Sequence, residues 1–188
     1  EIKKITKSPV YLENDADLVG LGEAVYGAGK GYSNVAYFTI STGVGGGLVI
    51  NGKIDASILR TEPGKQILDM KNSLTLENLV GGRSVKKKYH KKPYEILDKK
   101  FWDEMAEILA VGVHNTIVHW SPDVVVIGGS MMKKIGIKIP RVEFYLKRLM
   151  KISHVDLPFP KIKKATLGDF GGLYGALALV KQKKTSPS

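Results

Sequence analysis

A glycine-rich run between two apolar segments constrains this chain more than any other feature. Residues 40–48 read Ile-Ser-Thr-Gly-Val-Gly-Gly-Gly-Leu, with strand-like sequences on either side. Glycine lacks a Cβ and accepts positive φ, so a turn of this kind lets successive backbone N–H groups approach one anion. Upstream, Asn14 and Asp15 precede a helix-like segment and add a carboxylate. Together the two features indicate a phosphate loop and a general base, which is the outline of a phosphotransferase.

Hydrophobic periodicity divides the chain into strands and helices. The run Val-Val-Val-Ile at 124–127 is typical of a strand buried on both faces, and Asn51-Gly52 is a strong hairpin signal. Residues 58–74 have no clear period and are predicted to form an irregular insertion. The predicted strands are 34–41, 46–51, 53–57, 124–127 and 162–167, and the predicted helices are 16–26, 75–89 with a break at Gly81-Gly82, 94–120, 140–151 and 171–180.

This order of elements predicts an α/β fold with one mixed sheet of about five strands and flanking helices. Three antiparallel strands come first, and strands that alternate with helices follow. The pattern resembles that of the ribonuclease-H-like lobe in the actin, Hsp70 and sugar-kinase superfamily. Members of that superfamily have two such lobes, whereas this sequence has no internal repeat, so we expect a single lobe.

Composition limits the classes of function that are open to the chain. Its 188 residues suffice for one full-sized core or two small domains. The sequence has no cysteine, which excludes a cysteine nucleophile and any thiolate metal site. No apolar run is long enough to cross a bilayer, and the first residues lack the apolar core of a signal peptide. We therefore expect a cytoplasmic protein with no membrane partner.

The net charge of +11 comes mainly from lysine. Lysines cluster at 86–92, 161–164 and 181–184, while the whole chain has four arginines. Surfaces that read nucleic-acid bases normally use arginine forks and stacked aromatic side chains. A charge of this size can attract nucleic acid, a membrane surface or small anions such as ATP, but we interpret these lysines as solvated helix ends and loops, and we do not expect nucleic acid as a partner.

Six motifs along the chain resemble one known family. They are Pro-Val-Tyr-Leu-Glu-Asn-Asp-Ala at 9–16, Gly-Glu-Ala-Val-Tyr-Gly-Ala-Gly at 22–29, Thr-Gly-Val-Gly-Gly-Gly at 42–47, Leu-Glu-Asn-Leu-Val-Gly-Gly-Arg at 76–83, Pro-Asp-Val-Val-Val-Ile-Gly-Gly at 122–129 and Leu-Gly-Asp-Phe-Gly-Gly-Leu-Tyr-Gly-Ala at 167–176. In this order and spacing the chain resembles the ROK family (repressors, open reading frames and kinases). The enzymes of that family are bacterial-type glucokinases and related sugar kinases.

The resemblance implies a catalytic base and three sugar-binding residues. Asp15 matches the base that takes the proton from the attacking sugar hydroxyl, and Asn14 matches a residue that bonds a neighbouring hydroxyl. Glu62 and Glu77 match carboxylates that hold the sugar through its hydroxyls. Each has a plainer interpretation, because Asn14 and Asp15 suit a helix N-cap and the two glutamates suit an exposed surface.

The resemblance also implies an ATP-binding loop. The matching residues are Thr42, Gly43, Gly45 and Gly46 in the second phosphate loop of the family, and Gly128 and Gly129 at its nucleotide contacts. The alternative is that these glycines serve a hairpin and an ordinary strand-to-helix turn. The cofactors implied are ATP and Mg²⁺.

Two departures from the family pattern stand out. Many members bind a structural zinc with one histidine and three cysteines, but Lys65 occupies the histidine position and the chain has no cysteine. An ammonium group has no lone pair for a metal, so we expect no zinc. The family's first phosphate loop, of the type Asp-Gly-Gly-Thr, does not occur either. We therefore expect the N-terminal lobe of the family to be missing.

These observations predict the C-terminal lobe of an ATP-dependent kinase for a hexose or amino-hexose, impaired when alone and homodimeric by resemblance. Two alternatives stay open, namely the sugar-sensing lobe of a ROK-type repressor and a degenerate lobe without catalytic activity. The predicted organisation is a hinge segment with the Asn14–Asp15 helix at 1–33, the ribonuclease-H-like lobe at 34–180 and a basic tail at 181–188.

Overall fold

The computed structural model of the chain describes residues 5, 7–55, 61–153 and 158–185. Its strands are β1 (Asn34–Ile40), β2 (Val44–Ile50), β3 (Lys53–Ile54), β4 (Ile67–Asp69), β5 (Leu74–Thr75), β6 (Val124–Gly128) and β7 (Lys161–Lys164). Its main helices are α2 (Asp15–Tyr26), α3 (Leu76–Val80), α4 (Gly82–Tyr89), α5 (Lys99–Trp120), α6 (Ile139–Ile152) and α7 (Gly171–Thr185). Short 3₁₀ turns are η1 (Pro63–Lys65), η2 (Pro93–Glu95), η3 (Ser130–Met132) and η4 (Gly168–Phe170).

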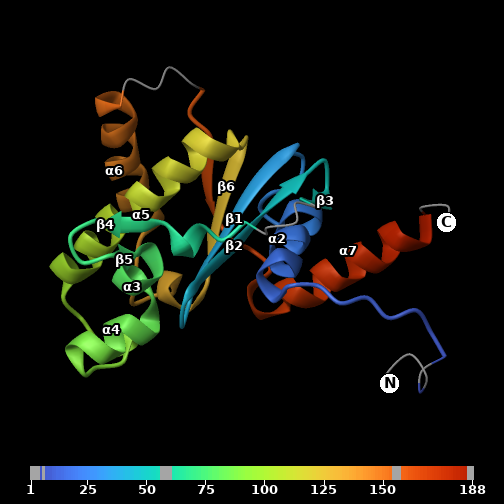
Figure 1. The fold of residues 1–188 in the computed structure, drawn as a ribbon, viewed down its shortest axis with the longest axis horizontal. Coiled ribbons are helices and arrows are strands. Elements are labelled where there is room, and N and C mark those ends of the chain that lie inside the picture. Colours follow the sequence, from blue (N-terminus) through green and yellow to red (C-terminus); the bar gives the residue numbers. More distant parts are fainter. Residues whose placement is uncertain (1–4, 6, 56–60, 154–157, 186–188) are drawn as a thin grey trace.

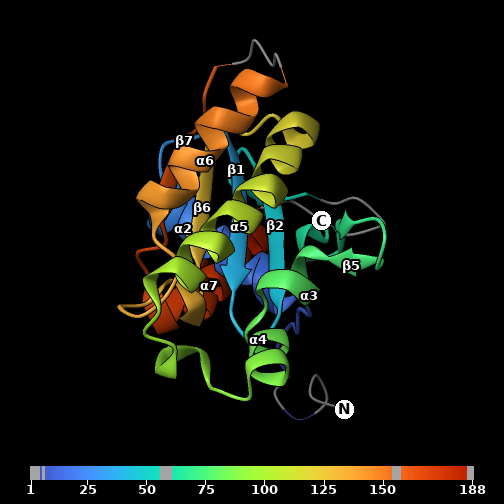
Figure 2. The ribbon, with the colours of Figure 1, turned by 90° about the vertical axis from the view of Figure 1, so that its left-hand side faces the viewer.

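Five strands form one mixed sheet in the order β3-β2-β1-β6-β7. β1 pairs antiparallel with β2 and parallel with β6, and β6 pairs parallel with β7. Helices α5 and α6 cover one face of the sheet, and α2 and α7 cover the other (Figure 1; Figure 2). The predicted α/β class, with a mixed five-stranded sheet and flanking helices, is confirmed.

The strand β6 carries the centre of the core because both of its faces are covered. Val125 and Ile127 pack into the cluster under α5 and α6, while Val124 and Val126 pack into the cluster under α2 and α7. All five β6 residues are buried. This double burial explains why the strand has no polar residue, as its uninterrupted apolar run predicted.

Close packing of α2 against α7 depends on small residues at the crossing. A Cβ added to Gly175 would lie 1.7 Å from the carbonyl oxygen of Leu18, and one added to Gly22 would lie 2.5 Å from the carbonyl oxygen of Gly171. Glycine is therefore required at both positions for the helix backbones to approach each other.

Among the helices of the described ranges, none is long and apolar enough to span a membrane.

The glycine run itself differs from the sequence prediction. We expected a turn over 42–45 and a strand from 46, but β2 begins at Val44, so Gly45, Gly46 and Gly47 lie within the strand. None of them has a positive φ. A Cβ on Gly46 would lie 2.1 Å from the carbonyl oxygen of Tyr37 and 2.7 Å from the Cγ of Pro63. These glycines therefore allow other segments to lie close against the strand, in addition to any role toward a ligand.

Three further predictions were wrong in part. The insertion predicted to be irregular contains η1 and a short hairpin in which β4 pairs with β5; residues 56–60, and with them the end of the strand predicted at 53–57, lie outside the described residues. The helix predicted from residue 94 begins at Lys99, because the Asp98 side chain accepts a hydrogen bond from the Lys100 N–H and caps it. The last helix extends beyond the predicted 180, to Thr185.

Candidate functional site

Asp15 lies at the start of α2, and its neighbour Asn14 caps the helix. The side-chain oxygen of Asn14 accepts hydrogen bonds from the N–H groups of Ala16 at 2.8 Å and Asp17 at 3.2 Å, which makes Asn14 the N-cap. Asp15 is the first residue of the helix and is exposed. Its Oδ1 accepts a 2.8 Å bond from the Ala16 N–H. The capping interpretation therefore holds for Asn14, and Asp15 stands at the surface of the site.

The turn between β1 and β2 is anchored by two distant segments of the chain. The Ser41 hydroxyl accepts a 3.0 Å hydrogen bond from the backbone N–H of Ser130, which follows β6. The carbonyl oxygens of Ser41 and Thr42 accept bonds from the N–H groups of Gly82 and Arg83 at the start of α4, at 2.8 and 2.9 Å. Two distant segments, the one after β6 and the start of α4, thereby hold the turn in position through three hydrogen bonds.

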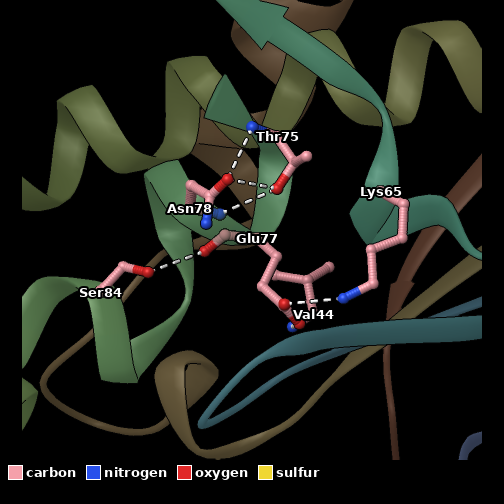
Figure 3. A network of polar contacts seen from close by, with 6 residues as sticks. All are labelled: Val44, Lys65, Thr75, Glu77, Asn78 and Ser84. Atoms are coloured by element: carbon pink, nitrogen blue, oxygen red, sulfur yellow. Dashed lines mark hydrogen bonds and ion pairs between the residues drawn. The ribbon is translucent and has the colours of Figure 1, made fainter. Parts of the chain in front are cut away.

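Glu77 closes the other side of this turn. Its Oε2 accepts a 2.9 Å bond from the Val44 N–H, and its Oε1 accepts a 2.8 Å bond from the Lys65 ammonium group (Figure 3). A Cβ on Gly43 would lie 2.3 Å from Glu77 Oε2, so any larger residue there would displace this carboxylate from its present position. The hydrogen bond from Lys65 is the main reason that the pKa of Glu77 is lowered, and it raises the pKa of Lys65.

The short helix α3 holds Glu77 in this position. The Thr75 hydroxyl accepts a bond from the Asn78 N–H, and the Asn78 side chain accepts one from the Thr75 N–H, which is a capping box (Figure 3). The Ser84 hydroxyl donates to the Glu77 carbonyl oxygen at 3.3 Å. Leu76, on the same helix, is fully buried against α5. The capping box and the Ser84 bond therefore hold the backbone of α3 from which the Glu77 side chain extends.

These groups line one pocket of about 530 Å³, which we call the acidic pocket. It contains eight of the predicted site residues, namely Asn14, Asp15, Thr42, Gly43, Gly45, Gly46, Glu62 and Glu77. Among the described residues that line it, four are carboxylates, namely Asp15, Asp17, Glu62 and Glu77, and one, Lys65, is a cation. An excess of oxygen acceptors suits a neutral ligand rich in hydroxyl groups, because each hydroxyl can donate a hydrogen bond.

Asp17 is a residue of this pocket that the sequence analysis did not select. Its side chain is 5% exposed, and a Cβ on Gly47 would lie 2.2 Å from its Oδ1. Gly47 therefore makes room for the Asp17 carboxylate under the β2 strand. The signal in the sequence was the spacing Asp-x-Asp at 15–17, but only the packing of α2 over β2 brings the second carboxylate into the pocket.

A second pocket of about 780 Å³, which we call the basic pocket, adjoins the first. Ser41 and Thr42 line both pockets. The cations that line the basic pocket come from α4, from the segment around η2 and from the segment after η3, and they are Arg83, Lys86, Lys92, Lys133 and Lys134. Five cations, with no carboxylate among the described lining residues, favour a polyanionic ligand. Tyr94 and Met131 provide apolar surface in the same pocket.

Gly128 and Gly129 are not among the residues that line either pocket. Gly129 has a φ of +98°, and a Cβ there would lie 2.3 Å from the carbonyl oxygen of Ile40. A Cβ on Gly128 would lie 2.8 Å from the Cβ of Ala165. Both glycines therefore serve the tight exit from β6, which brings the next residue, Ser130, to Ser41 and into the basic pocket. Their predicted contact with a nucleotide stays a prediction.

A comparison with protein-family models identifies the family of the chain. The model of the ROK family matches residues 1–183. The chain belongs to the ROK family. An uncharacterized protein of Clostridium perfringens is 31% identical to it over 93% of the chain and 67% of that protein. The N-acetyl-D-glucosamine kinase of Citrobacter koseri is 30% identical over 90% of the chain and 66% of its own length.

Solved structures of the ROK family agree with the fold. The ROK hexokinase from Thermus thermophilus superimposes with a TM-score of 0.81 at 25% identity, over 97% of this chain and 69% of the hexokinase. This ROK chain thus spans about two thirds of the length of the relatives that it matches along most of its length.

Proposed function

We propose that this ROK chain is the C-terminal lobe of an ATP-dependent sugar kinase, which transfers the γ-phosphoryl group of ATP to a hydroxyl of a hexose or amino-hexose. The observation that carries the proposal is the shared Ser41–Thr42 turn. It lines a pocket rich in carboxylates on one side and a pocket rich in cations on the other. A hydroxylated acceptor and a polyanionic donor would therefore meet at this turn.

On the acceptor side, Asp15 takes the proton of the attacking hydroxyl as the new O–P bond forms and the bond to ADP breaks. Its exposure at the start of α2 lets it reach a ligand in the acidic pocket. Asn14 offers its amide N–H₂ to a neighbouring hydroxyl, because its oxygen is occupied by the helix. Glu77 and Glu62 accept hydrogen bonds from further hydroxyls, with Glu77 already oriented by Lys65.

On the donor side, the basic pocket supplies charge for the phosphates, and the turn supplies backbone N–H groups and the Thr42 hydroxyl. The carboxylate-rich wall next to it suits Mg²⁺, which takes oxygen ligands and, when bound with ATP, neutralises charge that develops on the phosphates. Catalysis in phosphoryl transfer rests chiefly on positioning and electrostatic stabilisation. The rigid anchoring of the turn by Ser130 and α4 favours such positioning.

The rest of the proposal follows the family. The chain spans about two thirds of its relatives, and we infer that a second lobe with the first phosphate loop completes the cleft, so the lobe alone is impaired. The division into a hinge segment at 1–33, a lobe at 34–180 and a basic tail, the cytoplasmic location and a homodimer remain predictions. The expected lack of zinc rests on Lys65 and on the absence of cysteine.

The test is an ATP-plus-Mg²⁺ phosphorylation assay with a protein that contains both lobes, across glucose, fructose, N-acetylglucosamine, N-acetylmannosamine and allose. We expect turnover with at least one sugar and a loss of about 10²- to 10⁴-fold in kcat for Asp15→Asn. The matched control is Asp169→Asn, an exposed aspartate in η4 that lines neither pocket. Equal rates for both variants would overturn the role of Asp15.

The same assay separates the two alternatives. The effector-binding lobe of a ROK-type repressor would bind a sugar, measured by calorimetry, without transferring phosphate. A degenerate lobe would bind neither sugar nor ATP. Turnover that depends on Asp15 excludes both.

A further inference from the structure

A third cavity lies outside the two pockets of the proposed kinase site. It has a volume of about 720 Å³ and is lined by residues of 97–103, at the beginning of α5, and of 134–141, which lead into α6. We call it the α5–α6 cavity. The two helices pack side by side on one face of the sheet (Figure 2). Neither the proposed acceptor role nor the proposed donor role accounts for this cavity.

Part of the cavity wall is apolar. Trp102, Leu97 and Ile135 line it. The Trp102 indole N–H donates a 2.7 Å hydrogen bond to the Ile96 carbonyl oxygen, which fixes the ring, and the residue is 8% exposed. Leu97 is 75% exposed although it faces a cavity. A ligand with an aromatic or aliphatic body would cover this surface and remove it from water.

The remaining wall is strongly cationic. The basic residues that line it are Lys99, Lys100, Lys134, Lys138 and Arg141. Among the described residues that line the cavity, Asp103 is the one carboxylate, and it is engaged by Arg141 and by the Tyr145 hydroxyl at 2.7 Å. The hydrogen bond from Arg141 is the main cause of the lowered pKa of Asp103. Four lysines thus line the cavity with no second carboxylate among the described lining residues.

The Lys138 ammonium group is held by carbonyl groups. It donates to the carbonyl oxygens of Lys133 and Lys134, at 3.3 and 2.5 Å, so it is fixed at the edge of the cavity. Carbonyl oxygens carry no net charge, so the positive charge of Lys138 is not neutralised there. Asp98, beside the cavity, uses Oδ1 to cap α5 through the Lys100 N–H. The side chains around the cavity therefore carry a net positive charge, which favours a negatively charged ligand.

From the apolar and cationic parts of its wall, we propose that the α5–α6 cavity binds a small organic anion, namely a carboxylate or phosphate ester on an aromatic or aliphatic body. A bare inorganic anion would leave Trp102 and Leu97 uncovered, and a neutral apolar molecule would leave the lysines unpaired. The cavity is separate from the basic pocket, although Lys134 and Ile135 line both. Lys99, Lys100 and Arg141 belong to the α5–α6 cavity alone.

The experiment uses the fluorescence of Trp102, one of the two tryptophans of the chain. Trp120→Phe removes the other, which lies at the far end of α5. Phenyl phosphate is the probe, with inorganic phosphate and benzyl alcohol as the probes that lack its ring or its charge. We expect a saturable change with phenyl phosphate and affinities at least about tenfold weaker for the other two. The absence of saturation with phenyl phosphate would overturn the proposal.

Three double variants with the same loss of charge locate the binding. Lys99→Gln/Lys100→Gln should weaken phenyl phosphate binding about tenfold or more, whereas Lys183→Gln/Lys184→Gln on α7 should leave it unchanged. Arg83→Gln/Lys86→Gln removes two cations of the basic pocket and should also have little effect. Loss of binding in this third variant but not in the first would assign the probe to the basic pocket and overturn the proposal. Calorimetry on the chain with both tryptophans repeats the comparison if Trp120→Phe does not fold.

Discussion

The ammonium group of Lys65 lies 2.8 Å from Oε1 of Glu77 inside the acidic pocket, across 12 positions of sequence. The contact joins η1 to α3, two short elements that the sheet does not include. Because Glu77 also accepts the Val44 N–H, the ion pair ties the end of the β1–β2 turn to the insertion that follows β3. A ligand that bonds Glu77 must therefore share it with Lys65.

The pH dependence of stability should report this ion pair. Lys65→Met should lower the free energy of unfolding by no more than about 1 kcal/mol at pH 7, because the Lys65 side chain is 58% exposed and solvent screens the pair. The pKa of Glu77 is lowered in the folded state, so its contribution is present above its ordinary value of 4.5 and is lost as the pH falls through the lowered value. The pKa of Lys65 is raised, so its contribution is full below 10.5 and is lost at higher pH.

Urea unfolding at several pH values measures this difference. The gap between wild type and Lys65→Met should be present at pH 7 and should shrink as the solution is acidified well below pH 4.5. Lys71→Met, at an exposed lysine outside the site, is the control. A gap that stays constant down to pH 2 would mean that the lysine stem, and not its charge, stabilises the turn.

The glycines of β2 should differ sharply in their tolerance of alanine. Gly46→Ala forces a Cβ to within 2.1 Å of a backbone oxygen, whereas a Cβ at Gly45 meets only the side chains of Ala16 and Thr39, at 3.3 and 3.5 Å. We expect Gly46→Ala to destabilise the fold by about 2–3 kcal/mol or more and Gly45→Ala by less than about 1 kcal/mol. Urea midpoints compare the two variants, and equal losses would contradict the packing role of Gly46.

Glu23 should be required for the conformation of the loop after β7. The residue is 1% exposed, and Oε1 accepts the N–H groups of Thr166 and Leu167, both at 2.8 Å. Its Oε2 accepts the Ala28 N–H at 2.8 Å and the Thr166 hydroxyl at 3.2 Å. In Glu23→Gln, one acceptor becomes an N–H₂ group that faces donors, so we expect a loss of about 2–4 kcal/mol.

Urea unfolding of Glu23→Gln beside Glu107→Gln, an exposed position on α5, tests this expectation. The exposed variant should match the wild type within about 0.5 kcal/mol. Similar stabilities for all three proteins would show that the loop does not depend on the buried carboxylate.

The basic pocket should affect ATP more than sugar. In a protein with both lobes, Arg83→Gln/Lys86→Gln should raise the KM for ATP about tenfold and change the KM for the sugar little. The reason is that these two cations line the basic pocket and not the acidic pocket. Lys183→Gln/Lys184→Gln removes the same charge from α7 and controls for the general field of the protein. An unchanged KM for ATP in the first variant would place the nucleotide elsewhere.

Much of the fold could be predicted because its signals are local. The apolar run at 124–127 indicated a strand covered on both faces, and the break at Gly81-Gly82 separated α3 from α4. The pair Asn14–Asp15 marked the beginning of α2, and the family motifs selected eight residues that line one pocket. Each of these signals depends on neighbouring residues, since burial on a strand or helix face repeats with a short period.

Other features depended on contacts between distant segments. The sequence could not indicate that Gly46 faces Pro63, that Gly47 makes room for Asp17 or that Lys65 pairs with Glu77. A glycine has the same sequence signature whether it binds an anion, turns the chain or lets another backbone approach. The role of a glycine depends on which atoms would lie within about 3 Å of a Cβ added at that position. Only the packed structure defines these atoms.

The sequence by itself indicated the order of the main sheet strands and helices and the family, and it selected candidate site residues whose roles remain predictions. The tertiary structure alone decided how the Ser41–Thr42 turn is shared, with an acidic pocket on one side and a basic pocket on the other. The physical reason is that secondary structure follows from short-range periodicity, whereas a pocket is formed by side chains that chain folding brings together from remote positions.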